Sequence, residues 1–317
     1  RGVIAIRALR AAKELGYQVA SVYSTVDKDQ KHLKLSDEAI CIGPAEAKDS
    51  YLNEAAIISA AELVGADAIY PGYGFLAENS SFAEKCNQSG FKFVGPNSQV
   101  IEIMGDKIKA KELIESLGVP VVPGYTGDIK DQDHIEGIVE GIGYPVIVKA
   151  SAGGGGKGMR VVQNREELWD SVVSAQNEAE FAFGNGEVFI EKYLQKPRHI
   201  EVQVFGDGKG KVVHLFSRDC SLQRRYQKVL EEAPARNLPE DKLNEIQEIC
   251  VSACSELKYE GAGTLEFLYE NNEFYFIEMN TRIQVEHTVT EMITGVDLVQ
   301  AQLCLAIEGK FELEQEK

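Results

Sequence analysis

Two glutamates in a predicted hairpin, residues 264–280, could bind a divalent cation. With a two-residue turn, Glu266 and Glu278 would face opposite sides of the sheet, whereas a three-residue loop at 271–273 places them directly opposite each other. Such a loop needs a residue with positive φ, which asparagine tolerates. Facing carboxylates repel unless a cation lies between them, and oxygen-only ligands suit Mg²⁺ or Mn²⁺. We therefore expect the longer loop and a metal site at Glu266, Glu278 and Asn280; the alternative is two unrelated, solvent-facing glutamates.

The segment after the hairpin carries a cation, an amide and a carboxylate at alternate positions. Arg282, Gln284 and Glu286 would project to one side if this segment is extended. The cation and the amide suit a small anion, and the carboxylate suits a base. Residues 218–228 add four cations, namely Arg218, Arg224, Arg225 and Lys228. In an acidic chain these residues predict a local pocket for anions, and a salt-bridged face is the alternative.

A glycine-rich loop at 151–158 follows the predicted strand Pro145–Ala150. Its backbone is free to wrap a ligand closely, with N–H groups available for phosphate oxygens. It is not a Walker A motif, because a glycine follows its lysine and the next segment is a strand. We expect a flap over phosphates, with a flexible surface hairpin as the alternative. Lys149 and Lys107 are surface lysines by default, but beside such a flap they would bind phosphate.

Helices and short apolar strands alternate along residues 1–100, with glycines in the links. This alternation is typical of a parallel α/β sheet. The expected strands are Val19–Tyr23, Ala39–Ile42, Ala68–Tyr70 and Phe91–Val94, and the expected helices are Arg7–Leu15, Tyr51–Val64 and Ser80–Ser89.

Two prolines and a glycine at 119–124 interrupt this pattern and predict a domain boundary. A smaller unit follows, with strands on both sides of the glycine-rich loop. From residue 199 onwards, paired strands with short turns predict an antiparallel sheet. The expected division is an N-terminal parallel α/β domain at 1–104, a helical connection at 105–120, a lid at 121–194 and a central domain at 195–317.

The chain of 317 residues has 33 Lys and Arg against 50 Asp and Glu, a formal net charge of −17. Phosphate repels a net acidic surface, so nonspecific binding of nucleic acid is not expected. No apolar run approaches the roughly 18–20 residues that cross a bilayer. The sequence opens at Arg1 without a methionine, directly in a helical pattern, and we expect it to be a piece of a longer protein.

The sequence resembles the biotin carboxylases, the ATP-grasp component of biotin-dependent carboxylases such as acetyl-CoA, propionyl-CoA and pyruvate carboxylases. The resemblance covers essentially the whole chain, and the pattern from Glu278 to Glu286 is highly specific. It implies an α/β protein in which a Rossmann-like parallel domain precedes an ATP-grasp fold with a mobile lid and an antiparallel central sheet. The matching stretches are 70–76, 104–107, 149–158, 191–193, 198–203, 218–234 and 276–292.

The resemblance implies a ligase that carboxylates the biotin of a carrier protein, using ATP and bicarbonate through carboxyphosphate. It implies two Mg²⁺ or Mn²⁺ ions with ATP, a carboxyltransferase partner, and a homodimer in the full-length protein. A cytoplasmic location is expected, in fatty acid biosynthesis for example, or the mitochondrial matrix in a eukaryote. The family's first strand and the end of its C-terminal domain would lie outside this chain. The alternatives are a catalytically impaired ATP-binding fragment and another bicarbonate-activating ATP-grasp ligase.

Individual residues also acquire roles from the resemblance. Those that would bind ATP are Lys107, Lys149, Gly153, Gly154, Gly155, Gly156, Lys157, Gly158, Glu191, Lys192, Leu194, His199 and Gln223. Those that would hold metal ions are Glu266, Glu278 and Asn280. Those that would bind bicarbonate are Lys228, Arg282, Gln284, Val285 and Glu286, with Glu286 as the base and Lys228 and Arg282 also catalytic. Tyr73 and Arg282 would contact biotin.

Four positions depart from the family's usual residues. Val3 replaces a common Glu, Lys157 replaces Arg, and Thr288 replaces Pro. Lysine keeps the charge of arginine but not its bidentate geometry. Tyr226 replaces a His that lies near the nucleotide in many members, so it is left out of the expected site.

Overall fold

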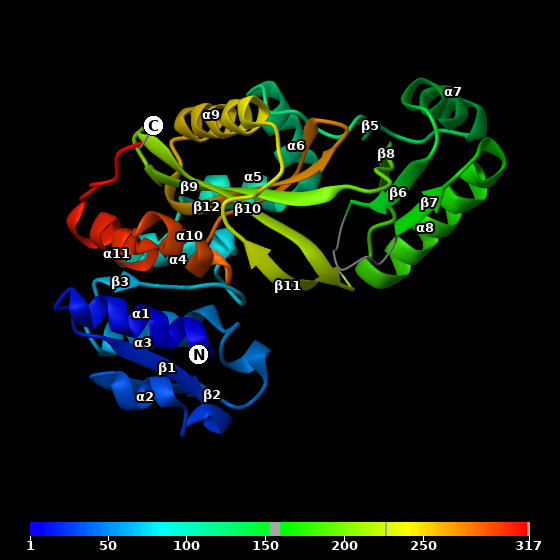
Figure 1. The fold of residues 1–317 in the computed structure, drawn as a ribbon. Helices are drawn as coiled ribbons and strands as arrows, with labels where there is room; N and C mark the ends of the chain where they lie inside the picture. Colours follow the sequence, from blue (N-terminus) through cyan, green and yellow to red (C-terminus); the bar gives the residue numbers. More distant parts are fainter. Residues whose placement is uncertain (152–158, 226, 316–317) are drawn as a thin grey trace.

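The computed structural model describes residues 1–151, 159–225 and 227–315 (Figure 1). The expected phosphate-binding residues Gly153, Gly154, Gly155, Gly156, Lys157 and Gly158 lie outside these ranges, as does Tyr226. Within them, no helix combines the length and the apolar character that crossing a bilayer requires.

The N-terminal region alternates helices and parallel strands, as expected. Strand β1 pairs with β2, and β3 pairs with β4, so the parallel pairing is confirmed in two separate two-stranded sheets. Helix α1 begins at Gly2 rather than Arg7, because apolar residues at helical spacing extend to Ile4, which is buried. The elements are α1 (Gly2–Glu14), β1 (Ala20–Ser24), the 3₁₀ turn Thr25–Asp27, α2 (Lys31–Leu35), β2 (Glu38–Gly43), the 3₁₀ turn Ala47–Asp49, α3 (Glu54–Leu63), β3 (Ala68–Ile69), α4 (Ser80–Gln88), β4 (Lys92–Phe93) and α5 (Ser98–Gly105).

A smaller unit follows helix α6 (Lys107–Ser116) and forms one end of the molecule (Figure 1). Its antiparallel sheet has the strand order β5-β8-β6-β7. Val146, Val148 and Ile190 in the sheet are fully buried together with residues of the two helices that cover it. The elements are β5 (Gly124–Tyr125), α7 (Gln132–Ile142), β6 (Val146–Ala150), β7 (Met159–Val162), the 3₁₀ turn Arg165–Glu167, α8 (Leu168–Phe183) and β8 (Val188–Lys192).

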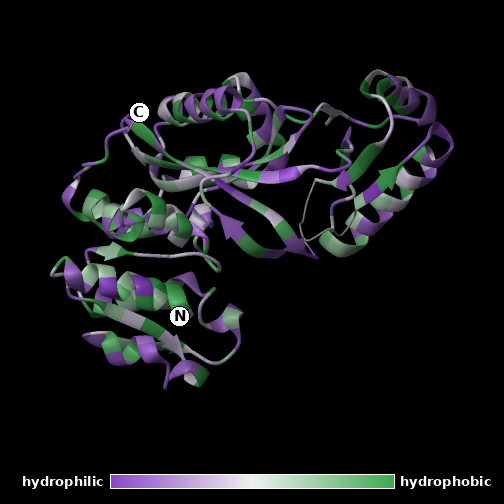
Figure 2. Ribbon diagram, viewed as in Figure 1, coloured by the Kyte–Doolittle hydropathy of each residue, from purple (hydrophilic) through white to green (hydrophobic). Residues whose placement is uncertain are grey.

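The largest sheet is antiparallel, as expected, with the strand order β11-β10-β9-β12-β13. Helices α5, α6 and α9 pack their apolar residues on one face, and α11 packs on the other face together with α1. Helix α9, for example, carries hydrophilic residues on its outer side (Figure 2). The elements are β9 (Arg198–Asp207), β10 (Val212–Arg224), β11 (Gln227–Glu232), α9 (Glu240–Glu256), β12 (Glu260–Glu270), β13 (Glu273–Asn280), α10 (His287–Thr294) and α11 (Leu298–Glu308).

The β12–β13 hairpin corrects the expected loop length. Its turn has two residues, Asn271 and Asn272, with φ of 53° and 64°, and Glu270 pairs with Glu273. The three-residue loop was therefore wrong, because two asparagines accept the positive φ values of a tight hairpin turn. Further along, Phe267 pairs with Phe276 but Glu266 pairs with Glu278, which leaves Ile277 as the extra residue of a β-bulge. The bulge, not the loop, brings Glu266 opposite Glu278.

Candidate functional site

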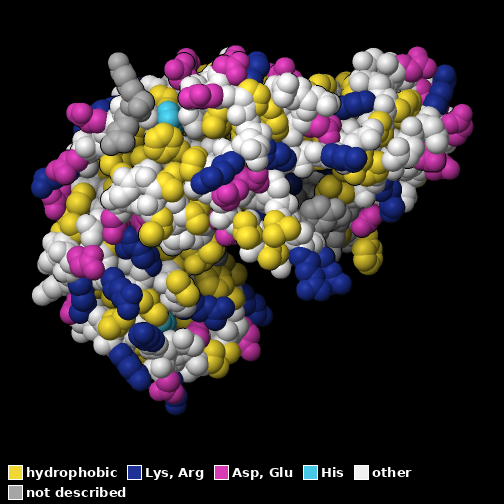
Figure 3. Space-filling model, in the orientation of Figure 1, with side chains coloured by type: hydrophobic (Ala, Val, Ile, Leu, Met, Phe, Trp, Pro, Cys, Tyr) yellow, Lys and Arg dark blue, Asp and Glu magenta, His cyan; other side chains and the backbone are white. Residues whose placement is uncertain are grey.

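A cavity of about 760 Å³ lies among α6, the lid sheet, the central sheet, the loop after β3 and the segment 281–286. The space-filling view shows the surface recessed between the central sheet and the smaller unit (Figure 3). Most of the expected site residues that the structure describes line this cavity: Tyr73, Lys107, Lys149, Glu191, His199, Gln223, Lys228, Glu266, Glu278, Asn280, Arg282, Gln284, Val285 and Glu286.

Three carboxylates form a row across adjacent strands of the central sheet. Glu266 on β12 pairs with Glu201 on β9 and with Glu278 on β13. Glu201 and Glu266 are buried, whereas Glu278 is accessible from the cavity. Alternation along β9 explains the placement, because Ile200 and Val202 point into the apolar core and Glu201 points the other way.

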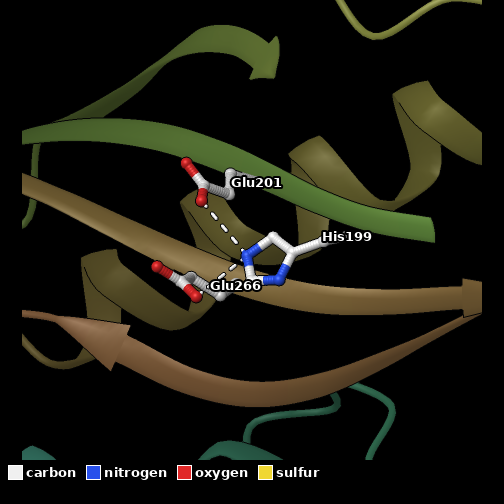
Figure 4. A group of neighbouring side chains, drawn as sticks. All are labelled: His199, Glu201 and Glu266. Carbon is white, nitrogen blue, oxygen red and sulfur yellow. Dashed lines mark hydrogen bonds and ion pairs between the residues drawn. The ribbon is translucent and has the colours of Figure 1, made fainter. Parts of the chain in front are cut away.

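Two cations that line the cavity, Lys228 and His199, compensate this row together with the buried Arg218. Lys228 on β11 donates to Glu201, to Glu266 at 2.9 Å and to Glu286. His199 Nε2 lies 3.1 Å from Glu201 Oε1 and 2.9 Å from Glu266 Oε2 (Figure 4). Although burial opposes the charged imidazolium, hydrogen bonds to these two glutamates raise the pKa of His199 to about 9. His199 is therefore protonated at neutral pH.

Glu278 differs from its two neighbours in the row. Desolvation by the surrounding protein, together with the negative charge of Glu266, raises the pKa of Glu278. The positive charges of Lys107 and Lys228 oppose this effect. In contrast, His199 and Lys228 help hold the pKa of Glu266 below its ordinary value despite burial. A divalent cation between Glu266 and Glu278 would remove their repulsion, and the oxygen donors fit Mg²⁺ or Mn²⁺. Asn280 is adjacent, where its side-chain N–H donates to Glu266 Oε1 at 2.8 Å.

The segment 281–286 supplies the anion-binding groups. Arg282, Gln284 and Glu286 all line the cavity, as their alternation predicted. Glu78 holds the start of the segment, accepting from the Thr281 backbone N–H at 3.1 Å and from Arg282 Nε at 2.8 Å. Arg282 also donates from Nη2 to Asn280 Oδ1 at 2.7 Å. The guanidinium is thereby fixed at the wall of the cavity.

Arg218 is fully buried beneath the side chains of Glu201 and Gln284, to which it donates hydrogen bonds. Its guanidinium donates to Glu201 Oε2 at 2.8 and 3.0 Å and to Gln284 Oε1 at 2.7 Å. Because the amide oxygen of Gln284 is held by Arg218, the amide nitrogen is the group that donates to Glu266 Oε1, at 2.8 Å. Further acceptors of Arg218 are Gln203, Thr264 and Thr290. This residue belongs to the cationic run, but its role is to orient other side chains.

The smaller unit, which corresponds to the expected lid, contributes a second ionic cluster. Glu191 on β8 is buried and accepts from Lys149 Nζ at 2.6 Å and from Lys111 Nζ at 2.9 Å. Ile147 on β6 is directly opposite Glu191 on β8, so the two share a face of the sheet. Lys149 lies two residues after Ile147 and therefore lies on the same face. Lys107, at the start of α6, lines the cavity beside them.

Two of the expected ATP-binding residues, Lys192 and Leu194, are not among the residues that line the cavity. The ammonium of Lys192 donates instead to the carbonyl oxygens of Gly143 and Tyr144, at 2.9 Å each. Leu194 is buried just after β8. Gln223 lines the cavity and donates to the Cys220 carbonyl oxygen at 2.9 Å.

Sequence reasoning missed Glu201, Glu78 and Lys111. For Glu201 a signal existed, because polar residues at 199, 201 and 203 alternate with apolar ones and so share one face of a strand. For Glu78 and Lys111 the sequence offers no such signal. Their partners lie 204 and 80 positions away along the chain.

The sequence matches known proteins along its length. Residues 1–101 match a family described as biotin carboxylase, N-terminal domain, and residues 106–314 match one described as carbamoyl-phosphate synthase L chain, ATP binding domain. A biotin carboxylase from Pseudomonas aeruginosa is 56% identical over 317 residues, covering 100% of this chain and 71% of that protein.

Two solved structures show the same fold. A biotin carboxylase complex with an ATP ligand from Campylobacter jejuni has a TM-score of 0.92 and 51% identity, covering 99% of this chain and 70% of that one. The biotin carboxylase domain of Hydrogenobacter thermophilus 2-oxoglutarate carboxylase, in complex with MgADP and bicarbonate, has a TM-score of 0.91 and 49% identity, with the same coverage.

Proposed function

Because the chain belongs to the biotin carboxylase family, we propose that its cavity carboxylates biotin at the expense of ATP, with bicarbonate as the source of the carboxyl group. The observation that carries this proposal is the contact of Lys228 with Glu201, Glu266 and Glu286, which joins a carboxylate pair suited to metal ions to the anion-binding segment. The alternative, another bicarbonate-activating ATP-grasp ligase, is not favoured, since two relatives that are 56% identical over the whole chain are biotin carboxylases.

ATP is proposed to bind between the lid and the central sheet. Lys107 and Lys149 would contact its phosphates, with His199 and Gln223 beside the nucleotide. Glu191, Lys192 and Leu194 lie at the end of β8, where the hinge would meet adenine. Glu266 and Glu278, with Asn280 next to them, would hold Mg²⁺ or Mn²⁺, which offsets the charge that develops on the phosphates.

Bicarbonate is proposed to bind at Arg282, Gln284, Val285 and Lys228. With Glu286 as base, a bicarbonate oxygen attacks the γ-phosphorus, ADP leaves, and carboxyphosphate forms. Carboxyphosphate then breaks into CO₂ and phosphate. The released phosphate would take the proton from the ureido N–H of biotin, and the nitrogen would then attack CO₂ to form carboxybiotin. Arg282 would stabilise the enolate-like form of the deprotonated ureido group, and Tyr73 lines the same cavity.

We also propose the division expected from the sequence, with an N-terminal domain at 1–104, a helical connection at 105–120, a lid at 121–194 and a central domain from 195. The lid would close over the nucleotide and exclude water, which would otherwise hydrolyse carboxyphosphate. A biotin carrier protein or domain is the proposed substrate, and a carboxyltransferase and a second copy of the full-length chain are proposed partners. The proposed location is cytoplasmic, or mitochondrial in a eukaryote.

The decisive experiment measures ADP release with bicarbonate and free biotin varied independently. We expect hydrolysis of ATP to require bicarbonate and to increase when biotin is added. Hydrolysis that ignores both additions would refute the assignment. Bicarbonate dependence without a response to biotin would favour a different bicarbonate-activating ligase.

A single substitution tests the proposed base. Glu286→Gln keeps the size of the side chain but removes its charge, so it should abolish the biotin-stimulated turnover, by about 100-fold or more, while ATP still binds. Turnover and ATP affinity are measured on the same preparation. Unchanged turnover would show that Glu286 is not the base.

A further inference from the structure

A second lysine, Lys111, shares the buried carboxylate of Glu191 with Lys149. Lys111 Nζ lies 2.9 Å from Glu191 Oε1, and Lys149 Nζ lies 2.6 Å from Oε2. Burial disfavours the ionised carboxylate, but the two ammonium groups hold the pKa of Glu191 below its ordinary value. One carboxylate therefore has two cations, one more than its charge requires.

The two lysines are held differently. Lys111 extends from α6, its side chain is 14% exposed, and it also donates to the Val122 carbonyl oxygen at 2.6 Å. Lys149 lies at the end of β6, its side chain is 24% exposed, and Glu191 is its ionic partner among the described residues. Its other close neighbour is the ring of Phe189, whose centroid is 5.9 Å from Nζ. Lys111 is thus anchored at two points, and Lys149 is the one that can leave.

We propose that Lys111 is a positioning residue of the nucleotide site, which keeps Glu191 paired when Lys149 moves to the phosphates of ATP. This inference rests on the proposed function, because it takes Lys149 as a phosphate ligand. If Lys149 were the sole partner, its departure would leave a buried carboxylate unpaired, which is strongly unfavourable. With Lys111 present, the pairing of Glu191 and the binding of phosphate do not compete for one ammonium group.

The experiment is calorimetric titration of the protein with MgATP, without bicarbonate or biotin. In Lys111→Met we expect Kd for MgATP to rise by about 10- to 100-fold, because binding now strands Glu191. The stranded carboxylate should also take up a proton, since burial without a counter-charge favours the neutral form. Titration at one pH in buffers of different ionisation enthalpy measures this uptake, which the wild type should lack.

Three further variants make the result specific. Lys109→Met makes the same change of net charge on the same helix, but Lys109 is 64% exposed and its pair with Asp106 is a surface pair, so Kd should change less than about 2-fold. Lys111→Arg keeps the charge and should stay close to wild type without proton uptake. In Lys111→Met combined with Glu191→Gln, no carboxylate is left to strand, so the double variant should bind MgATP as Glu191→Gln alone does.

The outcomes separate this inference from the proposed function. If the wild type binds MgATP and Lys111→Met binds it equally well, Lys111 has no positioning role although the proposed function stands. Weaker binding without proton uptake, or without rescue in the double variant, also overturns the inference, because a structural or direct role of Lys111 would act in that way. If the wild type does not bind MgATP, both proposals fail.

Discussion

Lys228 determines the charge balance of the cavity at the scale of single residues. Three carboxylates meet its ammonium group, two of them from neighbouring strands of the sheet and one from the segment 281–286. Burial alone would make such a cluster of carboxylates unstable, and the cation makes it tolerable. The same contacts place Lys228 at the boundary between the proposed metal site and the proposed bicarbonate site.

His199 should make the stability of the protein depend on pH. The folded protein retains a proton on His199 up to about pH 9, whereas the unfolded chain loses it near 6.5. This contribution is fully present below about pH 6.5 and is lost as the pH rises through about 9, and it amounts to at most about 3 kcal/mol. The free energy of unfolding, measured by urea denaturation from pH 6 to 9.5, should fall over this range.

The variant that tests this assignment is His199→Gln, and the matched control is His134→Gln. His134 lies on α7, where its ring packs against Tyr125. Loss of the pH slope in the first variant but not in the second is expected. A slope that persists in His199→Gln would assign it to another group.

Single residues also mark the limit of prediction from sequence. Glu266 and Glu278 were predicted from the register of a hairpin, and Arg282, Gln284 and Glu286 from their alternation in an extended segment. Glu201 could have been found by the same rule. Lys111 could not, because a lysine on a helix has no feature that reveals a buried partner on a distant strand.

At the scale of elements, the β12–β13 hairpin shows why a correct pairing was predicted for a wrong reason. Loop length and bulges both shift the register of a hairpin by one residue, and a shift by one exchanges the two faces. The sequence shows that the glutamates must share a face if they bind one ion, but it does not show where the extra residue lies. The structure places it at Ile277.

The turn of this hairpin can be tested directly. Asn271 has φ of 53°, a conformation that β-branched residues strongly disfavour. Asn271→Val should therefore lower the free energy of unfolding by about 1–2 kcal/mol, measured by chemical denaturation. Asn271→Gly is the control and should be close to neutral, since glycine adopts this conformation readily. Equal stability of the valine and glycine variants would contradict the observed turn.

The alternation of helices and strands was predictable at this scale because apolar periodicity is local. The expected parallel and antiparallel regions are both confirmed. The separation of the N-terminal strands into two sheets was not predictable, since it depends on contacts between distant segments.

At the scale of the whole molecule, the cavity is assembled from three regions that are far apart along the chain. Its walls include Tyr73 from the N-terminal region, Lys149 from the lid and Glu278 from the central sheet. A ligand with several phosphates can contact more than one of these walls at once. This arrangement is the basis for the proposed closure of the lid when such a ligand binds.

Hydrogen exchange should detect this closure. A non-hydrolysable ATP analogue with Mg²⁺ should slow amide exchange in β6 and β8, by up to about 2.7 kcal/mol of added protection at 100 times Kd. AMP is the control, because it lacks the β- and γ-phosphates that would reach Lys107 and Lys149. Exchange that is equally slow with AMP, or unchanged with the analogue, would contradict phosphate-driven closure.

The cations that already sit among the carboxylates bear on the order in which ligands arrive. Lys228 and His199 neutralise Glu201 and Glu266 before any nucleotide is present. A divalent ion alone must compete with these two cations for the carboxylates. An ion bound to a triphosphate must do so too, but the contacts of the triphosphate with the protein offset the cost of this competition. We therefore expect the enzyme without nucleotide to bind free Mg²⁺ only weakly. The concentration of the metal–nucleotide complex, rather than that of the free metal, would then determine the fraction of enzyme that is ready to react.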